Sequence, residues 1–492
     1  MQSLPADIYT VAAVREIDRS AIEDNGIPGY TLMTRAGEAS VAAARARFAA
    51  ARRWQVICGA GNNGGDGYVV ARLAAAEGIV VSVLALVEPD KLQGDAARAY
   101  MDFAAAGGAI VPWAGELDAQ ADLLFDGILG SGLEREVSGE FAKAVQAINA
   151  HSAPVVALDI PTGINGDTGA MLGCAVKADL TVTFVGLKSG LFLLDALDHC
   201  GELVFAGLDI PDDAKGEPKT AFRRIDASLL MQALPRRARS AHKGDFGHVL
   251  VVGGGEGMPG AVRLCGEAAL RAGAGRVSVA THPAHAANIA ASRPELMCHA
   301  IDDIKKLEQL IEKSDVIAFG PGLGQSAWAR ELFDRVVAST LPCVWDADAL
   351  NLLAAAPGES EDRVITPHPG EAGTLLGISA NKVQSDRPGA LAELAEKYGG
   401  VAVLKGAGSL VSSSDGAPWL CTSGNPGMAA PGMGDVLTGI IAALLGQGLS
   451  VERAAAIGVE VHAQAGDRAA RAGQRGLLAS ELMQELRSVI NP

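Results

Sequence analysis

Short apolar runs, rich in Val, Ile and Leu, alternate along the whole chain with alanine-rich stretches of helical character. In the first half, these runs cover residues 54–61, 80–87, 123–130, 154–161, 180–186 and 202–210. Both faces of each run are apolar, which is typical of strands in a parallel sheet that helices cover on both sides. The alternation predicts an α/β fold built from βαβ units, whose ligand sites lie at the carboxyl ends of the strands.

The apolar runs stop near residue 210 and resume near residue 247. Between them lies a polar and then basic segment that includes ALPRRARSAHKGD. A chain of 492 residues is longer than one hydrophobic core usually organises. We therefore expect two domains, residues 1–215 and 225–492, with a boundary between residues 212 and 240. The second set of predicted strands covers residues 247–255, 275–281, 315–324, 342–350, 363–368 and 401–408.

Charge and cysteine usage narrow the class of protein. The formal net charge of −16 argues against a nucleic acid as the main partner, because binding a polyanion requires a basic face. Seven cysteines without a CxxC pair favour reduced thiols. We see no signal peptide, and the longest apolar stretch, residues 436–445, is too short to cross a bilayer. We expect a cytoplasmic homo-oligomer that acts on small molecules and has no nucleic-acid or membrane partner.

The glycine-rich sequence GAGNNGGDG, residues 59–67, follows the first predicted strand. It contains G-x-G-x-x-G, the pattern of dinucleotide-binding turns, and Glu88 lies near the end of the next strand. The alternative is a tight turn in which glycines relieve steric crowding and a polar residue caps the helix. Capping needs one polar side chain, whereas Asn62, Asn63 and Asp66 offer three. The loop therefore favours a ligand site.

Two other strand ends of the first domain carry oxygen-bearing side chains. Asp126 precedes a glycine loop whose N–H groups suit an anion, and Asp159 and Thr162 follow another strand. If Asn63, Asp126 and Thr162 converge, their oxygens suit K⁺ or Mg²⁺, although each alone also fits a helix cap. Asp159, flanked by apolar residues, is a candidate acid or base. Lys188 is either a proton donor or anion ligand, or a solvated surface lysine.

The motifs MTRAG (residues 33–37), GAGNNGGDG, GILGSGL and ALDIPTGINGDTG occur in this order within about the first 210 residues. Together they resemble the NAD(P)H-hydrate epimerases. The resemblance implies a Rossmann-like three-layer domain that binds K⁺ through Asn63, Asp126 and Thr162. It also implies substrate binding by Asn62, Asn63, Gly64, Gly65, Asp66, Gly130, Ser131, Gly132, Leu133, Glu134, Arg135, Glu136 and Asp159.

In the second domain, NPGMAAPGMGD (residues 425–435) precedes apolar residues at helical spacing, which predicts a buried helix over 436–445. Asp435 is either the N-cap of this helix or a catalytic base. The base interpretation is favoured because Gly427, Gly432 and Gly434 clear side chains from the same place. Backbone amides exposed there, with the positive end of the helix, form an anion hole for a phosphoryl group.

Other strand ends of this domain predict a nucleotide site. VAVLKGAGSLV, residues 401–411, runs into a turn that suits phosphate or adenosine oxygens, and it is not a Walker A loop. His368 lies between two prolines that fix its backbone, so we interpret it as a site residue, with an ordinary turn histidine as the alternative. Asp346 and Asp348 either assist Mg²⁺ or cap a helix. Three more strand-end loops cover residues 253–264, 320–324 and 366–371.

The motifs GGGEGMPGA, GPGLG, DADALN, TPHPGE, LKGAGS and NPGMAAPGMGD resemble the ADP-dependent (S)-NAD(P)H-hydrate dehydratases of the ribokinase-like superfamily. Superfamily kinases commonly carry G-A-G-D at the anion hole, and in this chain Met433 replaces the alanine of that motif. The resemblance covers about residues 225–490 and implies a ribokinase-like three-layer domain that uses ADP and Mg²⁺. It implies that Ala261, Gly322, His368 and Asp435 contact the hydrate and that Lys405, Gly406, Ala407, Gly408, Ser409 and Gly434 contact the nucleotide.

The two resemblances together imply one repair function. Hydration of a reduced nicotinamide ring creates a stereocentre bearing a hydroxyl, so that two epimers arise. We expect the first domain to interconvert them, with Asp159 as acid or base. We expect the second to consume the S form, with Asp435 activating the hydroxyl toward the terminal phosphoryl of ADP. The alternatives are a small-molecule kinase in the second domain, and a non-catalytic nucleotide-binding module or, less well matched, a dehydrogenase in the first.

Overall fold

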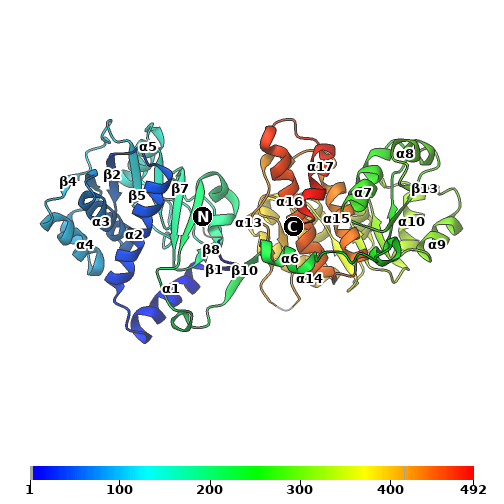
Figure 1. Cartoon of the computed structure of the whole chain (residues 1–492), viewed down its shortest axis with the longest axis horizontal. Helices are drawn as coiled ribbons and strands as arrows, with labels where there is room; N and C mark the ends of the chain where they lie inside the picture. Colours follow the sequence, from blue (N-terminus) through cyan, green and yellow to red (C-terminus); the bar gives the residue numbers. More distant parts are fainter. Residues whose placement is uncertain (1–3, 415, 492) are drawn as a thin grey trace. The chain divides into compact units, whose positions relative to one another are not determined.

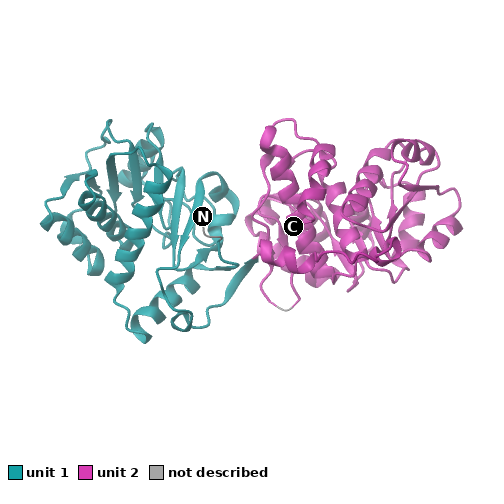
Figure 2. Ribbon diagram, viewed as in Figure 1, with its two compact units in different colours: residues 1–223 teal, residues 224–492 magenta. Residues whose placement is uncertain are grey.

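The computed structural model describes residues 4–414 and 416–491, and the chain divides into two compact units, residues 1–223 and 224–492 (Figure 2). The division lies inside the segment of changed composition between residues 212 and 240. Within the described residues, no helix combines the length and apolarity that a membrane span requires.

Seven parallel strands form the main sheet of the first unit, in the order β4-β3-β2-β5-β6-β7-β9 (Figure 1). All six runs predicted in this half are strands. The sheet adds β4 at one edge, which the sequence missed because its residues are mostly exposed. The bounds are β2 Arg53–Cys58, β3 Val80–Ala85, β4 Ala109–Pro112, β5 Leu123–Gly127, β6 Val155–Leu158, β7 Leu180–Phe184 and β9 Glu202–Ala206.

Successive residues of the central strand β2 enter two different cores. Trp54 and Val56 join the apolar cluster that contains side chains of α2, α3 and α4, whereas Ile57 joins a second cluster with side chains of α5. Because adjacent strand residues point to opposite faces, helices cover both faces of the sheet. This confirms the predicted Rossmann-like three-layer fold. The helices are α2 Gly29–Arg47, α3 Asn62–Ala76, α4 Gly94–Ala105 and α5 Gly139–Ala150.

The N-terminal segment forms short elements beside the main sheet. Strand β1 (Asp7–Tyr9) pairs in parallel with β8 (Leu187–Lys188) and antiparallel with β10 (Thr220–Arg224). Helix α1 (Val11–Arg19) follows β1, and the Thr10 side chain accepts a hydrogen bond from the Ala13 N–H at 3.2 Å as its N-cap. The sequence did not predict these strands, because their residues, DIY, LK and TAFRR, include charged side chains and form no continuous apolar run.

In the second unit, parallel strands run in the order β13-β12-β11-β14-β15-β16-β17, and β18 and β19 continue the sheet antiparallel. All six predicted strands are present, and β13 is an additional, half-exposed edge strand. The bounds are β11 His248–Val252, β12 Arg276–Thr281, β13 Met297–Ala300, β14 Val316–Phe319, β15 Cys343–Trp345, β16 Arg363–Ile365, β17 Val401–Leu404, β18 Leu410–Val411 and β19 Trp419–Leu420.

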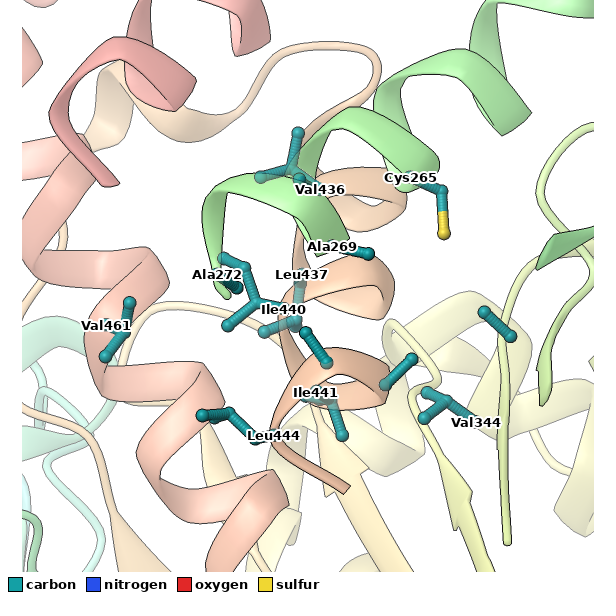
Figure 3. Packing of buried hydrophobic residues seen from close by; sticks show 14 of the residues in the cluster. Cys265, Ala269, Ala272, Val344, Val436, Leu437, Ile440, Ile441, Leu444 and Val461 are labelled. Atoms are coloured by element: carbon teal, nitrogen blue, oxygen red, sulfur yellow. The ribbon is translucent and has the colours of Figure 1, made fainter. Parts of the chain in front are cut away.

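Helix α15 (Met433–Gly446) is the central helix of one face of this sheet and contains the predicted helix over 436–445. Its apolar side chains pack among those of α7, α16 and β15, as Figure 3 shows. A Cβ at Gly439 would lie 2.1 Å from the Cys265 carbonyl oxygen, so only glycine permits this close approach of α15 to α7. Burying each large aliphatic side chain here contributes roughly 2 kcal/mol.

On the opposite face, Phe333 of α10 contacts both Phe319 and Trp345, with ring centroids 6.4 and 5.5 Å apart. Helices therefore cover both faces, which agrees with the predicted ribokinase-like architecture. The remaining helix bounds are α6 Ala227–Ala233, α7 Pro259–Arg271, α8 Ala286–Ser292, α9 Ile304–Ile311, α10 Ala327–Val337, α11 Asp348–Ala355, α12 Pro369–Leu376, α13 Ala380–Ser385, α14 Arg387–Tyr398, α16 Val451–Ala469 and α17 Ala479–Val489.

Candidate active sites

A cavity of about 910 Å³ lies at the carboxyl ends of β2, β5 and β6 in the first unit. Its walls come from α1, the start of α3, the loop after β5 and the residues that follow β6 and β7. Most of the predicted substrate-binding residues line it, namely Asn62, Asn63, Asp66, Gly130, Ser131, Gly132, Leu133, Glu134, Arg135 and Asp159. Gly64, Gly65 and Glu136 do not line it, and neither does Glu88, the acid of the dinucleotide pattern.

At two positions of the GAGNNGGDG loop, close packing leaves no room for a side chain. A Cβ at Gly64 would lie 2.2 Å from the Gly59 carbonyl oxygen, and one at Gly65 would lie 2.6 Å from the Met33 methyl group. Helix α3 starts after Gly61, which provides no side-chain cap. Neither asparagine is therefore the N-cap that the alternative interpretation required, and the amides of the first turn stay open to a ligand.

Asp126 and Thr162 are in direct contact beneath this cavity. Oδ1 of Asp126 accepts a hydrogen bond from the Thr162 hydroxyl at 2.7 Å, and Oδ2 accepts one from the Thr162 N–H at 2.7 Å. Burial raises the pKa of Asp126 to about 6, although these hydrogen bonds act in the opposite direction. The threonine hydroxyl also accepts from the Leu129 N–H at 2.9 Å, which ties the start of the Gly130 loop to this pair.

Asn63 is the third residue of the predicted cation site. It is 7% exposed, and neither its amide oxygen nor its amide nitrogen has a hydrogen-bond partner among the described residues. A Cβ at Gly130 would lie 3.6 Å from the Asn63 Oδ1 atom. A buried amide oxygen without a partner is costly, so this donor set fits a cation that accepts oxygen ligands. Within the described residues, no group of three or more His, Cys, Asp and Glu side chains forms a metal site of the transition-metal kind.

Lys188 is the buried partner of Asp159. Its side chain is 1% exposed, and its ammonium group forms an ion pair with Asp159 Oδ1. It also donates to the Thr183 hydroxyl at 3.1 Å and to the Phe184 carbonyl at 2.8 Å. The surface interpretation of Lys188 is therefore wrong. Asp159 itself has a φ of +66°, a conformation that costs a non-glycine residue about 1–2 kcal/mol and is typical of functional sites.

Two more carboxyl groups of the same cavity come from other elements. Asp66 belongs to α3, and Asp18 belongs to α1. Burial raises the pKa of Asp66 well above its ordinary range, with further contributions from Asp159 and Asp18. Burial also raises the pKa of Asp18 to about 6, although the Lys188 charge lowers it. Sequence analysis missed Asp18, because it stands among other charged residues in a helix without a motif.

The N-terminus of α15 carries the principal candidate of the second unit. The N-cap of this helix is Gly432, with a φ of +86° and no capping side chain. Asp435 lies within the first turn, half-buried, and among the described residues its carboxylate accepts no hydrogen bond. Burial raises the pKa of Asp435 to about 7, the Asp346 charge adds to this, and the Lys405 charge opposes it. The carboxyl is therefore not engaged in capping its own helix.

Lys405 and Asp346 form a buried ion pair against the same turn. The Lys405 ammonium lies 2.6 Å from Asp346 Oδ1, and the Thr438 hydroxyl of α15 donates to Asp346 Oδ2 at 2.9 Å. A Cβ at Gly434 would lie 3.3 Å from both the ammonium nitrogen and Asp346 Oδ2. Gly434 thus lets the pair approach the exposed amides of α15. Ion pairing lowers the pKa of Asp346 despite its burial.

His368 and Asp348 hold neighbouring loops in place. His368 is the N-cap of α12, where its Nδ1 accepts from the Gly370 N–H at 3.0 Å, and Glu371 accepts in return from the His368 N–H at 2.8 Å. Glu371 lies 3.7 Å from the Lys405 ammonium. Asp348 is not an N-cap, since its Oδ2 accepts from the Gly324 N–H at 2.8 Å. The helix-cap alternative for Asp348 is therefore wrong.

The other predicted contacts lie on the first turn of α7 and on the loops that follow β14 and β17. A Cβ at Gly322 would lie 3.0 Å from the Ala261 Cβ, so these two predicted hydrate contacts adjoin. Arg387 of α14, which the sequence did not single out, supports the nucleotide turn. It donates to the carbonyls of Leu404 at 3.2 Å and Gly408 at 3.1 Å. The turn itself comprises Lys405, Gly406, Ala407, Gly408 and Ser409.

Two family models match different parts of the chain. A family described as NAD(P)H-hydrate dehydratase matches residues 249–488, and one described as YjeF-related protein N-terminus matches residues 29–190. A ribokinase-like superfamily protein of Enterococcus faecalis, solved at 1.80 Å, superposes with a TM-score of 0.52 and 28% identity. The match covers 55% of this chain and 98% of that one.

Curated relatives align along the entire chain. The bifunctional NAD(P)H-hydrate repair enzyme Nnr of Coxiella burnetii is 47% identical over 486 residues, with 99% of each chain covered. The Escherichia coli enzyme of the same name is 44% identical over 495 residues, which covers 100% of this chain and 95% of that one. The chain therefore belongs to the bifunctional NAD(P)H-hydrate repair enzymes, which combine an NAD(P)H-hydrate epimerase and an NAD(P)H-hydrate dehydratase.

Proposed function

We propose that the cavity of the first unit is the epimerase site and that the N-terminus of α15 is the dehydratase centre, which removes water from the S hydrate at the expense of ADP. One observation carries the second assignment. The Asp435 carboxylate accepts no hydrogen bond from the described residues at a helix end whose glycines expose backbone amides. A carboxylate held there in its free form is available to a substrate hydroxyl.

In the dehydratase step, Asp435 removes the proton from the hydroxyl of the S hydrate. The hydroxyl oxygen attacks the terminal phosphoryl group of ADP, and AMP leaves. Phosphate then departs from the ring carbon, the neighbouring ring carbon loses a proton, and the double bond reforms, which restores NADH or NADPH. Amides of the first turn of α15 and the Lys405 ammonium stabilise the negative charge on the phosphoryl oxygens.

Binding of the two substrates follows the predicted sets. Ala261, Gly322 and His368 contact the hydrate beside Asp435, and the turn from Lys405 to Ser409 with Gly434 holds the nucleotide. Mg²⁺ would bind beside this nucleotide turn and would supply positive charge to the phosphates.

In the epimerase site, Asn63, Asp126 and Thr162 would hold K⁺, as the unpartnered Asn63 amide supports. Bound there, K⁺ would supply positive charge close to the loop that follows β5. The remaining set from the α3 start and that loop, including Gly64, Gly65 and Glu136, binds the hydrate. Asp159, fixed by Lys188, acts as acid or base on the hydroxylated carbon.

The whole protein tests the proposal directly. A mixture of NADH hydrate epimers is incubated with ADP, Mg²⁺ and K⁺, and recovery of the reduced nicotinamide absorbance is followed together with AMP and phosphate. We expect both epimers to be consumed, with one AMP and one phosphate per NADH formed. Formation of ADP from ATP, with phosphorylation of another alcohol and no NADH, would instead indicate a kinase.

We also propose that the functional domains span residues 1–215 and 225–492 and that the protein is cytoplasmic. We further propose that it forms a homo-oligomer and has no nucleic-acid or membrane partner. The net charge of −16 supports the exclusion of nucleic acid.

A further inference from the structure

We propose that Asp18 of α1 is a catalytic residue of the epimerase, which exchanges a proton with the substrate hydroxyl while Asp159 serves the incoming water. The inference rests on the proposed epimerase site. It assigns a role to a helix that precedes every motif on which the family resemblance depends.

Helix α1 is placed so that Asp18 enters the cavity. Val14 and Ile17 are buried, and the Val11 N–H donates to Asp167 Oδ1 at 2.7 Å, which anchors the start of the helix. Arg15 and Asp18, three residues apart and thus on one helical face, both line the cavity. Glu16 belongs to the solvent side, where it pairs with Arg19 at 2.7 Å.

The charges around Asp18 distinguish it from the other two carboxyl groups. The Lys188 ammonium donates to Asp159, to the Thr183 hydroxyl and to the Phe184 carbonyl, so its direct ion-pair partner is Asp159. Asp18 and Asp66 have no hydrogen-bond partner among the described residues, and the Lys188 charge only partly offsets the effect of burial on their pKa values. A carboxyl group that is withdrawn from water without a direct ion-pair partner favours its protonated form. Asp18 and Asp66 can therefore hold protons, whereas Asp159 is bound directly by the Lys188 ammonium.

Proton affinity then separates Asp18 from Asp66. Facing Asp18 are Lys188 from β8, Asp159 from the end of β6, Asp66 from α3 and, on its own helix, Arg15. Burial raises the pKa of Asp18 to about 6, with the Lys188 charge acting in the opposite direction and the Asp159 charge in the same one, whereas the pKa of Asp66 is raised well above its ordinary range. A group that titrates near neutrality can both give and recover a proton in each turnover. Asp66 remains protonated and suits hydrogen bonding to the substrate.

Inversion at the hydroxylated carbon needs an acid and a base. The carbon bears both the hydroxyl and the ring nitrogen. Asp18 protonates the hydroxyl, the C–O bond breaks and water leaves, while the nitrogen lone pair forms the C=N bond of an iminium ion. A water molecule adds to the other face of the carbon, the C=N electron pair returns to nitrogen, and Asp159 takes the released proton. Exchange with solvent then moves one proton from Asp159 back to Asp18, and the reverse reaction exchanges the two roles.

The test compares Asp18→Asn, which keeps the shape of the side chain but cannot exchange a proton, with Glu16→Gln on the outer side of α1. In the full-length protein, conversion of the R to the S hydrate is followed by NMR, with the uncatalysed rate subtracted. We expect a fall of at least about 100-fold in kcat for Asp18→Asn, with KM changed by less than about threefold. Asp18→Glu should recover a measurable part, and Glu16→Gln should behave as wild type.

Two readouts separate catalysis from folding. ADP-dependent dehydration of the purified S hydrate by the same Asp18→Asn sample should equal that of wild type. The pH dependence of wild-type epimerisation should contain a group near pH 6 that Asp18→Asn lacks. Asp18→Asn with kcat within threefold of wild type, or with the same pH profile, would overturn the role of Asp18. A wild-type protein that does not exceed the uncatalysed rate would instead refute the epimerase site itself.

Discussion

Each unit places a buried lysine beside an aspartate at the end of a parallel strand, but the two lysines hold different partners. In the first unit, Lys188 pairs directly with Asp159, the predicted acid or base. In the second, Lys405 pairs with Asp346 and leaves Asp435 without a hydrogen bond from the described residues. The lysine–aspartate ion pair thus includes the reactive carboxylate, Asp159, in the first unit. In the second unit, it lies beside the reactive carboxylate, Asp435, and does not include it.

This difference explains why the reactive carboxyl groups differ in proton affinity. Asp346 is already paired, so its charge acts on Asp435 together with burial and raises the pKa of Asp435 to about 7. Such a group is a base strong enough to activate an alcohol while still ionised at neutral pH. In the first unit, the proton-holding groups are Asp18 and Asp66, which lack the lysine as a hydrogen-bond partner. A lysine can therefore bind the reactive carboxylate directly, as Lys188 binds Asp159. It can also bind a neighbouring carboxylate and leave the reactive one without an ion-pair partner, as Lys405 does beside Asp435.

Replacing Lys405, the lysine of the second unit, should cause the larger loss of activity. Lys405→Met removes the cation beside the anion hole and leaves Asp346 buried without its partner. We expect ADP-dependent dehydration to fall by about 10³-fold, since transition-state charge stabilisation is usually the largest single contribution to catalysis. Steady-state rates with purified S hydrate measure the loss, and exposed Lys382→Met serves as the control. A fall of less than tenfold would show that Lys405 does not contact the phosphoryl group.

The corresponding change in the first unit should cost less activity. Lys188→Met removes the ion-pair partner that fixes the Asp159 side chain, and we expect epimerisation to fall by about 10²-fold. Removing one partner of a buried ion pair should also lower the free energy of unfolding of this unit by about 3 kcal/mol. NMR of epimer conversion and urea denaturation provide the two measurements, with exposed Lys177→Met as the control. Unchanged epimerisation would mean that the ion pair has only a structural role.

Dehydration should depend on pH through the unpaired carboxyl. Because the pKa of Asp435 is raised to about 7 and the base form is the ionised one, kcat/KM should rise about tenfold per pH unit below pH 7 and level off above it. The sign for stability is opposite. Protonated Asp435 favours the folded state at low pH, and this contribution is lost as pH rises through 7. A pH profile that is flat between 5.5 and 8 would contradict the assignment.

The smallest effect concerns the cation site. Thr162→Val removes the hydroxyl that Asp126 and the Leu129 N–H both use, whereas Thr162→Ser retains it. We expect Thr162→Val to lower the free energy of unfolding by about 1–3 kcal/mol and to weaken activation of epimerisation by K⁺. Titration of KCl against NaCl in the NMR assay distinguishes the two variants. Equal K⁺ dependence in both would exclude Thr162 as a ligand.

The sequence predicted most of the fold because buried parallel strands are apolar on both faces. Every predicted strand was confirmed, and the strands it missed are either exposed at a sheet edge, like β4 and β13, or very short. The location of Asp435 was also predictable, since a glycine cluster next to an apolar helix is a local pattern. That its helix is capped by Gly432 instead could be seen only in the structure.

Side-chain partners depend on tertiary structure and could not be predicted. Burial of Lys188 is decided by β8, whose pairing partner β1 lies far away in the chain. Asp346 was expected to assist a metal or cap a helix, but Lys405 and Thr438 occupy both of its oxygens. Asp18 and Arg387 carry no local signal, because a charged residue in a polar helix looks the same whether it faces solvent or a cavity.

The central claim is that the Asp435 carboxylate activates the substrate hydroxyl, and Asp435→Asn tests it most directly. Purified S hydrate and ADP are mixed with excess enzyme, and NADH formation is followed in a single turnover, with epimerisation of the R hydrate measured on the same sample. We predict that NADH formation falls by at least about 10³-fold while epimerisation and ADP binding are unchanged. NADH formation at the wild-type rate would contradict the account.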